Sequence, residues 1–234
     1  MPSTWVVGDI HGCAEELHAL LERIELGPQD RCISVGDLYH RGPDPYGVCQ
    51  LLAARPNVSL VLGNHERALL RRAGLAGRRA DGSDAPPIPS ELSRLDRRGD
   101  GHAPLAQVTD DQFRRMLQLL ERRPYFLEGP GWLVLHAGLL PGRKPSETPP
   151  DALVRTHRIA ALPGKPLWHD VYAGPDLALY GHVPHRQPRP HRRAGRLVAL
   201  GLDTGCVHGG SLTAFRVETR ELVQVPAGRA YAAR

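Results

Sequence analysis

The amino-acid sequence predicts an α/β fold, and three features of its first third carry the prediction. Short apolar runs recur at residues 4–7, 31–35 and 58–62. Each run ends at a glycine beside a polar residue, and each is followed by a segment with helical apolar spacing. Repeated strand, polar loop and helix are typical of parallel βαβ units. Because ligands bind beyond the carboxyl ends of such strands, the polar residues there are candidate site residues.

The helices expected in this region cover residues 13–25, 46–55 and 64–73. A further amphipathic helix is expected over 110–123, with Thr109 as a possible N-cap. Two more apolar runs, at 131–135 and 177–180, predict further strands. The alternation over 196–225 predicts a run of antiparallel strands.

Residues 74–109 break this pattern, because they are rich in glycine, proline, aspartate and arginine. The segment predicts a long loop or cap insertion, with a short helical turn around 91–96. With no internal repeat and no linker composition elsewhere, residues 1–234 are expected to form a single domain.

Composition places the chain among globular proteins, with 41% hydrophobic and 24% charged residues. The net charge of +5 favours anionic partners, although a solvated basic surface explains it equally well. No apolar run approaches the roughly 18 residues that span a membrane, and no leader is recognisable, so a cytoplasmic protein is expected. Four scattered cysteines without CxxC spacing are expected to be reduced and buried: Cys13, Cys32, Cys49 and Cys206.

Six candidate metal ligands follow the predicted strands, each near a glycine: Asp9, His11, Asp37, Asn64, His136 and His182. Oxygen and imidazole donors without a thiolate suit Mn²⁺, Fe²⁺ or Zn²⁺. A single histidine after a strand is more often a surface or core residue, but five such strand ends argue for one site. A carboxylate can bridge two ions about 3.5–4 Å apart, and Asp37 is the expected bridge. With Asp37 as the bridge, Asp9 and His11 are expected to bind one ion, because they lie two residues apart in extended chain. The second ion is then expected to be bound by Asn64, His136 and His182.

Five ordered motifs resemble the signature of the PPP-type metallophosphatases of the calcineurin-like superfamily. They are GDIHG at 8–12, GD at 36–37 with Arg41-Gly42, GNHE at 63–66, HAG at 136–138 and GH at 181–182. The resemblance spans residues 8 to about 213. It implies a two-layer β-sandwich flanked by helices and two metal ions, manganese first, with iron, zinc or cobalt as alternatives. It also implies a metal-bound hydroxide that attacks phosphorus in line.

Two residues are candidates for direct roles in catalysis. His65 follows the ligand Asn64 but is expected to point away from it along extended chain, as a general acid for the leaving oxygen. Arg41 offers a planar fork for phosphate oxygens. The resemblance also implies a second phosphate-binding arginine near a tryptophan. Trp168 is present but is followed by His169-Asp170, so the arginines that remain as alternatives are Arg155, Arg158 and Arg143.

His40 departs from the protein-phosphatase members, which carry there an aspartate that hydrogen-bonds the catalytic histidine. Dinucleoside-polyphosphate hydrolases and the related bacterial tetraphosphatase-like phosphatases lack that aspartate. We therefore expect hydrolysis of dinucleoside polyphosphates such as diadenosine tetraphosphate. Their phosphoanhydride bond has a good leaving group, so His65 can act with a weaker partner than an aspartate. The alternatives are a serine/threonine protein phosphatase and a non-catalytic nucleic-acid-binding protein; the complete ligand set argues against the latter.

The expected partner is a phosphorylated small molecule or nucleotide, with a phosphoprotein or capped RNA as alternatives and no membrane. The basic segment 184–193 either extends the positive field beside His182 or forms a solubilising hairpin loop. Residues 203–206 and 209–210 resemble the closing strand-turn segment of the same superfamily, and the resemblance implies that they support the metal ligands.

Overall fold

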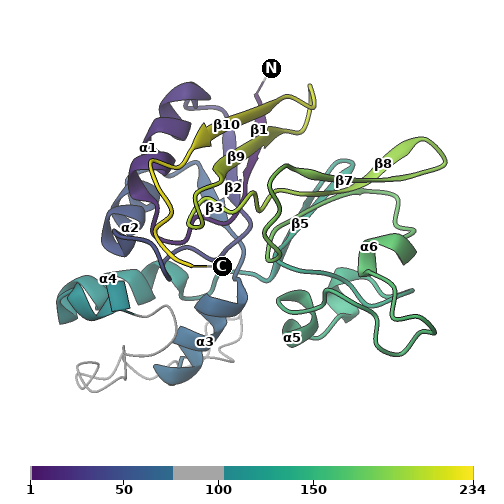
Figure 1. The fold of residues 1–234 in the computed structure, drawn as a ribbon, viewed down its shortest axis with the longest axis horizontal. Helices are drawn as coiled ribbons and strands as arrows, with labels where there is room; N and C mark the ends of the chain where they lie inside the picture. Colours follow the sequence, from purple (N-terminus) through teal and green to yellow (C-terminus); the bar gives the residue numbers. More distant parts are fainter. Residues whose placement is uncertain (1, 76–102, 234) are drawn as a thin grey trace.

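Two five-stranded mixed sheets pack against each other, as the computed structural model shows for residues 2–75 and 103–233 (Figure 1). Sheet A has the order β10-β9-β1-β2-β3 and sheet B the order β4-β5-β6-β8-β7. The strands of sheet A are β1 (Thr4–Val7), β2 (Arg31–Ser34), β3 (Val58–Leu60), β9 (Ser211–Arg216) and β10 (Leu222–Pro226). Those of sheet B are β4 (Phe126–Gly129), β5 (Trp132–Leu135), β6 (Leu177–Tyr180), β7 (Arg189–Arg193) and β8 (Arg196–Gly201).

The core between the sheets forms because side chains alternate along each strand. On β5, Trp132 and Val134 join Val6 and Ile33 of sheet A in this inner layer. Leu133 points to the opposite side of β5 from Trp132 and Val134, and it packs with its neighbours on the outer face of sheet B. The predicted two-layer α/β sandwich is confirmed.

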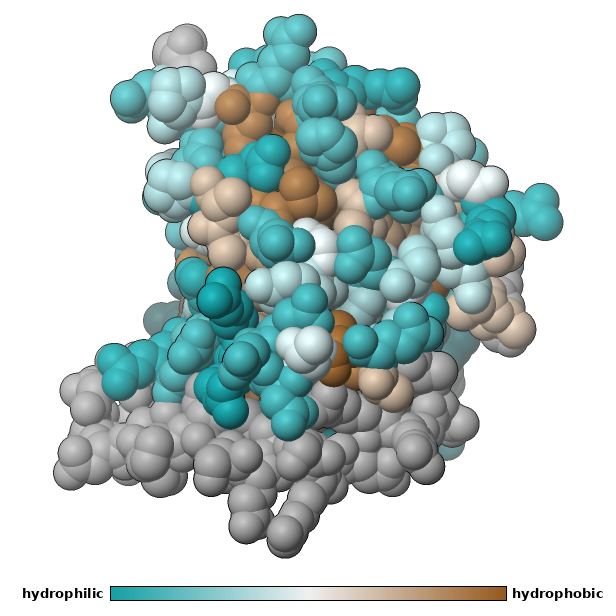
Figure 2. Space-filling view, turned by 90° about the vertical axis from the view of Figure 1, so that its left-hand side faces the viewer, coloured by the Kyte–Doolittle hydropathy of each residue, from teal (hydrophilic) through white to brown (hydrophobic). Residues whose placement is uncertain are grey.

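The helices cover the outer faces of the two sheets (Figure 1). On sheet A lie α1 (Ala14–Arg23), α2 (Pro45–Ala53), α3 (Asn64–Arg72) and α4 (Asp110–Leu120); beside sheet B lie α5 (Pro150–Leu153) and α6 (Trp168–Val171). Two 3₁₀ helices, Ala103–Gln107 and Pro145–Glu147, complete the set in the described residues. The face carrying α1 and α2 is mostly hydrophilic, with small apolar spots between polar side chains (Figure 2).

The βαβ units at the start of the chain are confirmed. β1 pairs with β2 and β2 with β3, both in parallel, and α1 and α2 connect them. Thr109 caps α4: its hydroxyl accepts a hydrogen bond from Gln112 N at 3.2 Å, and the Gln112 side chain accepts one from Thr109 N at 2.8 Å. All four cysteines are free and buried, as expected.

Three predictions about strands were wrong or incomplete. β4 was missed, and it forms an antiparallel hairpin with β5. The basic segment 184–193 contains β7, an edge strand, which is a position that tolerates its proline. The alternating run over 196–225 is divided between the sheets: β8 pairs in parallel with β6, whereas β9 and β10 belong to sheet A. Alternating apolar and polar residues show which face of a strand is buried, but not which strands it pairs with. The sequence therefore could not reveal this division.

The expected cap insertion lies largely outside the described residues, and so does the helical turn expected around 91–96. The part described, residues 103–107, is the first 3₁₀ helix. None of the helices within residues 2–75 and 103–233 has the length and apolar character needed to cross a bilayer.

Candidate metal centre

The six predicted ligand residues converge where strands from both sheets end. Asp9 and His11 follow β1, Asp37 follows β2, and Asn64 opens α3 after β3. From sheet B, His136 directly follows β5 and His182 follows β6. All but Asn64 and His182 are almost fully buried. The parallel strands thus bring together residues that lie up to 173 positions apart in the sequence.

Asp37 lies at the centre of the cluster, and its two carboxylate oxygens face different groups of donors. Oδ2 is 3.6 Å from His11 Nε2 and 3.9 Å from His65 Nε2. Oδ1 is 3.5 Å from His136 Nε2. This arrangement is the one a carboxylate needs to bridge two cations.

The second donor group surrounds the Asn64 amide oxygen, which lies 3.0 Å from both His136 Nε2 and His182 Nδ1. His136 Nδ1 lies 2.9 Å from the Val35 carbonyl oxygen, an acceptor, so this nitrogen carries the proton. The Nε2 lone pair of His136 therefore faces the cluster, which is how a backbone carbonyl orients a metal-binding imidazole.

The electrostatics of the cluster favour bound cations. Burial raises the pKa of Asp9, and the nearby Asp203 and Asp37 carboxylates raise it further. Burial also lowers the pKa of His11 to about 3 and that of His182 to about 4, so both imidazoles are neutral at pH 7. Buried carboxylates beside neutral imidazoles are costly unless a positive charge compensates them. Donor atoms of His11, Asp37 and His65, and of Asp37, His136 and His182, also lie within 4.8 Å of one another, so the residues fit divalent ions.

Two details of the backbone differ from the expectation of extended chain. His11 has a left-handed φ of 49°, so Asp9 and His11 converge across a turn, with Asp9 Oδ2 4.0 Å from His11 Nε2. Asn64 and His65 are the first two residues of α3. Helical geometry, about 100° per residue, directs their side chains to opposite sides of Asp37. The predicted divergence of these side chains is therefore present, but its cause is different.

His65 and its neighbours occupy the side of Asp37 that carries His11. The His65 ring lies 4.4 Å from the His40 ring, tilted by 40°, and 5.4 Å from the His11 ring. Arg41 reaches the same side, with Nη1 3.0 Å from His11 Nε2. Burial lowers the pKa of His65, while the Asp37 carboxylate opposes that change. The expected contact between His40 and His65 is present.

The remaining arginine candidates lie in different surroundings. Arg155 is exposed, and its charge is close enough to lower the pKa of His65. Arg158 Nη1 instead donates to the Lys165 carbonyl at 3.0 Å. Trp168 is buried against Gly138, where an added Cβ would clash with the indole ring.

A family model, Calcineurin-like phosphoesterase, matches residues 2–205, which is most of the chain. The chain belongs to the calcineurin-like phosphoesterase family. A bis(5'-nucleosyl)-tetraphosphatase PrpE [asymmetrical] of Geobacillus thermodenitrificans is 30% identical over 260 residues, covering 94% of this chain and 93% of that protein. A symmetrical bis(5'-nucleosyl)-tetraphosphatase of Aromatoleum aromaticum is 29% identical, covering 96% and 97% of the two chains.

Solved structures agree with this membership. The crystal structure of a protein assigned provisionally as a diadenosine tetraphosphatase superposes with a TM-score of 0.73 at 28% identity, covering 97% of this chain and 96% of the other. A serine/threonine phosphatase from Saccharomyces cerevisiae matches with a TM-score of 0.58 at 15% identity, covering 97% and 79%, which shows the shared fold alone. As a calcineurin-like phosphoesterase, the protein is a metal-dependent hydrolase.

Glu66 contacts two loops of the candidate site, and sequence analysis gave it no role. Its carboxylate is fully buried and accepts backbone hydrogen bonds from Asp37 N at 2.7 Å, Leu38 N at 2.8 Å and Gly63 N at 3.0 Å. Burial raises the pKa of Glu66, and these three N–H donors oppose the rise. Glu66 therefore joins the loops after β2 and β3. The signal in the sequence was an acidic residue in the first turn of a helix directly after two candidate site residues.

Glycine beside the candidate ligands has a steric cause. A Cβ on Gly181 would overlap Oδ1 of Asp9, and a Cβ on Gly63 would overlap Oδ1 of Asp37. The backbone N–H of His182 can consequently donate to both oxygens of Asp9, at 3.2 and 3.1 Å. Asp203, predicted to support the ligands, accepts from Gly205 N at 3.0 Å and acts electrostatically on Asp9.

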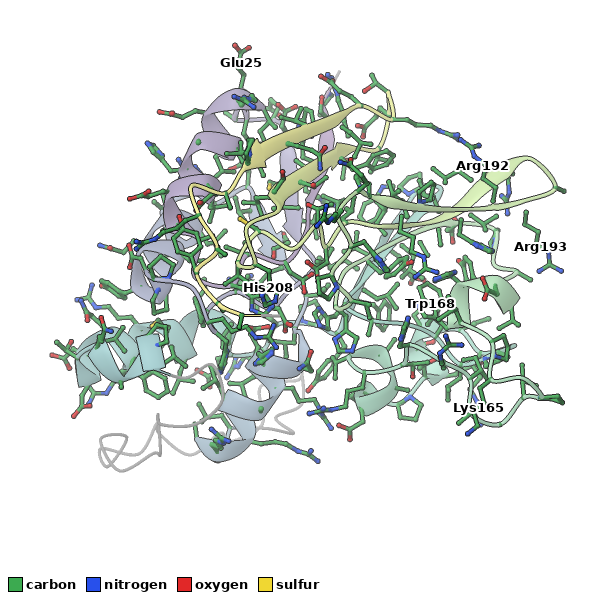
Figure 3. All side chains as sticks on the ribbon, in the orientation of Figure 1. Glu25, Lys165, Trp168, Arg192, Arg193 and His208 are labelled. Carbon is green, nitrogen blue, oxygen red and sulfur yellow. The ribbon has the colours of Figure 1, made fainter. Side chains whose placement is uncertain are left out.

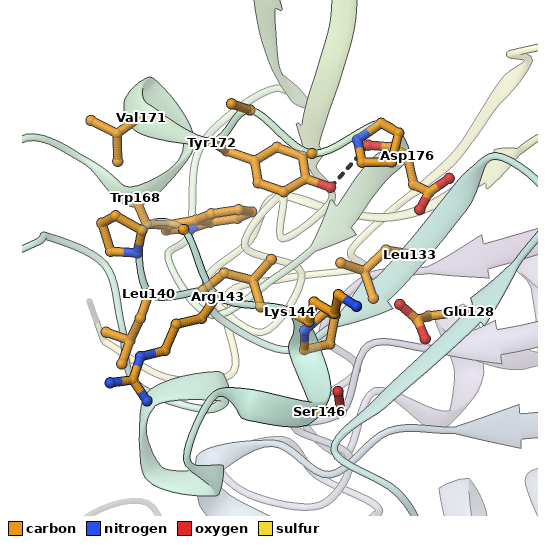
Figure 4. Close-up of a pocket in the computed structure, with 17 residues that line it drawn as sticks. Glu128, Leu133, Leu140, Arg143, Lys144, Ser146, Trp168, Val171, Tyr172 and Asp176 are labelled. Atoms are coloured by element: carbon orange, nitrogen blue, oxygen red, sulfur yellow. Dashed lines mark hydrogen bonds between the residues drawn. The ribbon is translucent and has the colours of Figure 1, made fainter.

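A separate pocket of the phosphoesterase, about 470 Å³ in volume, lies outside sheet B and shares no residue with the metal cluster (Figure 4). Leu133, Trp168 and Tyr172 form part of its lining, together with Arg143 and Lys144. The Tyr172 hydroxyl donates to the carbonyl of Asp176 at 3.1 Å.

Proposed function

We propose that this phosphoesterase hydrolyses phosphoanhydride bonds of dinucleoside polyphosphates such as diadenosine tetraphosphate. The observation that carries the hydrolytic proposal is the position of Asp37, with one oxygen facing each donor group. The full-length similarity to relatives named bis(5'-nucleosyl)-tetraphosphatases supports the substrate. So does His40, in ring contact with His65 where the protein phosphatases carry an aspartate. A phosphoanhydride needs less help from a general acid than a phosphoserine does, because its leaving group is less basic.

We further propose which residues hold the metal ions. Asp9 and His11 would hold one ion, Asn64, His136 and His182 would hold the second, and Asp37 would be shared between the two. Manganese suits this oxygen and imidazole set, with iron, zinc and cobalt as alternatives that metal analysis distinguishes. Divalent ions at this position supply Lewis acidity toward phosphate oxygens and lower the pKa of water.

The chain's own residues bind the phosphate and supply the proton. Arg41, held beside His11, binds the non-bridging oxygens of the scissile phosphate. His65 donates a proton to the leaving oxygen. Arg155 is the preferred second phosphate-binding arginine, because its charge is close enough to lower the pKa of His65. Arg158 is less suitable, because its guanidinium donates to the Lys165 carbonyl.

A cytoplasmic location and a single-domain organisation complete the proposal. The four free, buried cysteines are typical of a reducing compartment. A soluble nucleotide is the proposed partner, with capped RNA and phosphoproteins as the alternatives to be tested.

The test is a substrate panel of dinucleoside polyphosphates, capped RNA and phosphoserine peptides. The chain is loaded with Mn²⁺, its metal content is measured, and Asp37→Asn is run beside it. We expect turnover of the dinucleoside tetraphosphate by the wild type and loss of both activity and metal in the variant. Turnover of phosphopeptides without turnover of dinucleoside tetraphosphate would refute the substrate. An active, fully metallated Asp37→Asn variant would remove Asp37 from the bridging role.

A further inference from the structure

A second group of metal-type donors lies where α6 meets the edge strand β7. It consists of His169 and Asp170 of α6 and His191 of β7, whose ligand atoms all lie within 4.8 Å of one another. None of the three belongs to the cluster around Asp37. We propose that these residues form a separate zinc site.

The distances between the donors suit one small cation. Asp170 Oδ1 lies 3.3 Å from His169 Nδ1 and 3.6 Å from His191 Nδ1. Two ligands bound to zinc at about 2.0–2.1 Å in tetrahedral geometry are themselves about 3.3–3.4 Å apart. The two pairs therefore need little movement to share one ion. Two imidazoles and one carboxylate form a common donor set for zinc with an open fourth position.

The carboxylate is already oriented for this role. Asp170 Oδ2 accepts a hydrogen bond from Leu167 N at 3.1 Å, which leaves Oδ1 facing the two imidazoles. On the other side, the pairing of β7 with β8 shifts register between His191 and Arg192. Such irregularities re-aim side chains near functional sites. An oxygen fixed by a backbone bond is the kind of support that metal ligands have.

His169 gives an independent reason to expect a ligand. Its side chain is only 3% exposed, yet Nδ1 makes no hydrogen bond with any described residue. The Asp170 oxygen is near this nitrogen but outside hydrogen-bonding geometry. Buried polar nitrogens normally have a partner, and a cation in this position would provide one.

The surroundings of the site allow an ion to enter. The side chains of Asp170 and His191 are 43% and 23% exposed, which leaves room for a water as fourth ligand. Arg189 is the nearby cation, but its Nη1 is directed to His185 Nε2 at 3.1 Å. Figure 3 shows Arg192 and Arg193 at the periphery of this region, beyond Trp168. Tyr180, the last residue of β6, stacks on His169 with ring centroids 5.6 Å apart, and it belongs to neither group of donors.

The experiment measures zinc bound per chain. Full-length wild type, His191→Ala and Asp170→Asn are stripped with a chelator, equilibrated with micromolar zinc, freed of unbound ion and analysed by mass spectrometry. His18→Ala is the matched control, because the His18 side chain is 56% exposed and belongs to neither group of donors. In Asp170→Asn a side-chain oxygen can still accept the hydrogen bond from Leu167 N, so this variant should keep its fold. It therefore tests the proposal even if His191→Ala misfolds.

We expect His191→Ala and Asp170→Asn each to bind one zinc fewer per chain than the wild type, and His18→Ala to match the wild type. The same difference is expected when His191→Ala is added to Asp37→Asn, because the two sites share no ligand. This readout does not depend on the hydrolytic activity or on its substrate. Equal zinc contents in the wild type, His191→Ala and Asp170→Asn would overturn the proposal.

Discussion

Replacing Glu66 with glutamine tests whether its buried carboxylate joins the loops that present Asp37 and Asn64. All three hydrogen bonds to Glu66 come from backbone N–H groups, so both carboxylate oxygens act as acceptors. Glutamine has one oxygen and one NH₂ group in almost the same shape. The substitution therefore changes hydrogen bonding and charge with little change in packing.

The magnitude follows from the bonds that glutamine can keep. Its oxygen can retain the bonds from Asp37 N and Gly63 N, which share Oε2, but its NH₂ group then faces the N–H of Leu38. A buried donor without an acceptor costs about 1–3 kcal/mol, and the retained bonds lose charge assistance worth about 1 kcal/mol. We expect Glu66→Gln to lower the free energy of unfolding by about 3 kcal/mol. For a chain of this size the melting temperature then falls by about 6–12 °C.

The assay is thermal and urea unfolding followed by circular dichroism, with bound metal measured in parallel. Glu15→Gln is the matched control, since Glu15 is an exposed glutamate in the first turn of α1. Its effect should stay within about 0.5 kcal/mol. The metal content of Glu66→Gln should also fall, because the loop that carries Asp37 loses its support. If the two variants melted at the same temperature, the bonds to Glu66 would not hold these loops.

Four further predictions concern the site and its scaffold. His65→Ala should lower the hydrolysis rate of an alkyl phosphate far more than that of an aryl phosphate, because an aryl leaving group needs no general acid; equal losses would argue that His65 is not the proton donor. His40→Asp should raise phosphomonoester turnover, because a carboxylate in contact with His65 stabilises its protonated form; an unchanged rate would contradict this. Gly181→Ala should weaken metal binding in a titration, because the new methyl group overlaps Asp9 Oδ1; unaltered affinity would show that Asp9 can move. Thr109→Ala should cost about 1 kcal/mol of unfolding free energy through loss of the α4 cap, whereas Thr109→Ser should not.

The candidate site was largely predictable because its residues follow a rule of chain topology. Parallel strands end at the same edge of a sheet, so glycine-flanked polar residues after β1, β2 and β3 had to meet. The same reasoning placed His136 and His182 after β5 and β6. It could not show which Asp37 oxygen faces which donors, because that depends on how the two sheets pack.

The sequence by itself determined the local features of this protein. These are the βαβ units, the cap at Thr109, and the positions of Asp9, Asp37 and Asn64 just after three successive strands. Each depends on residues near one another in the chain. Only the tertiary structure decided the division of β8 and β9 between two sheets and the fully buried position of Glu66. It also decided the meeting of Asp170 with His191, twenty-one residues away. Contacts of this kind depend on which elements pack together, and local periodicity carries no information about that choice.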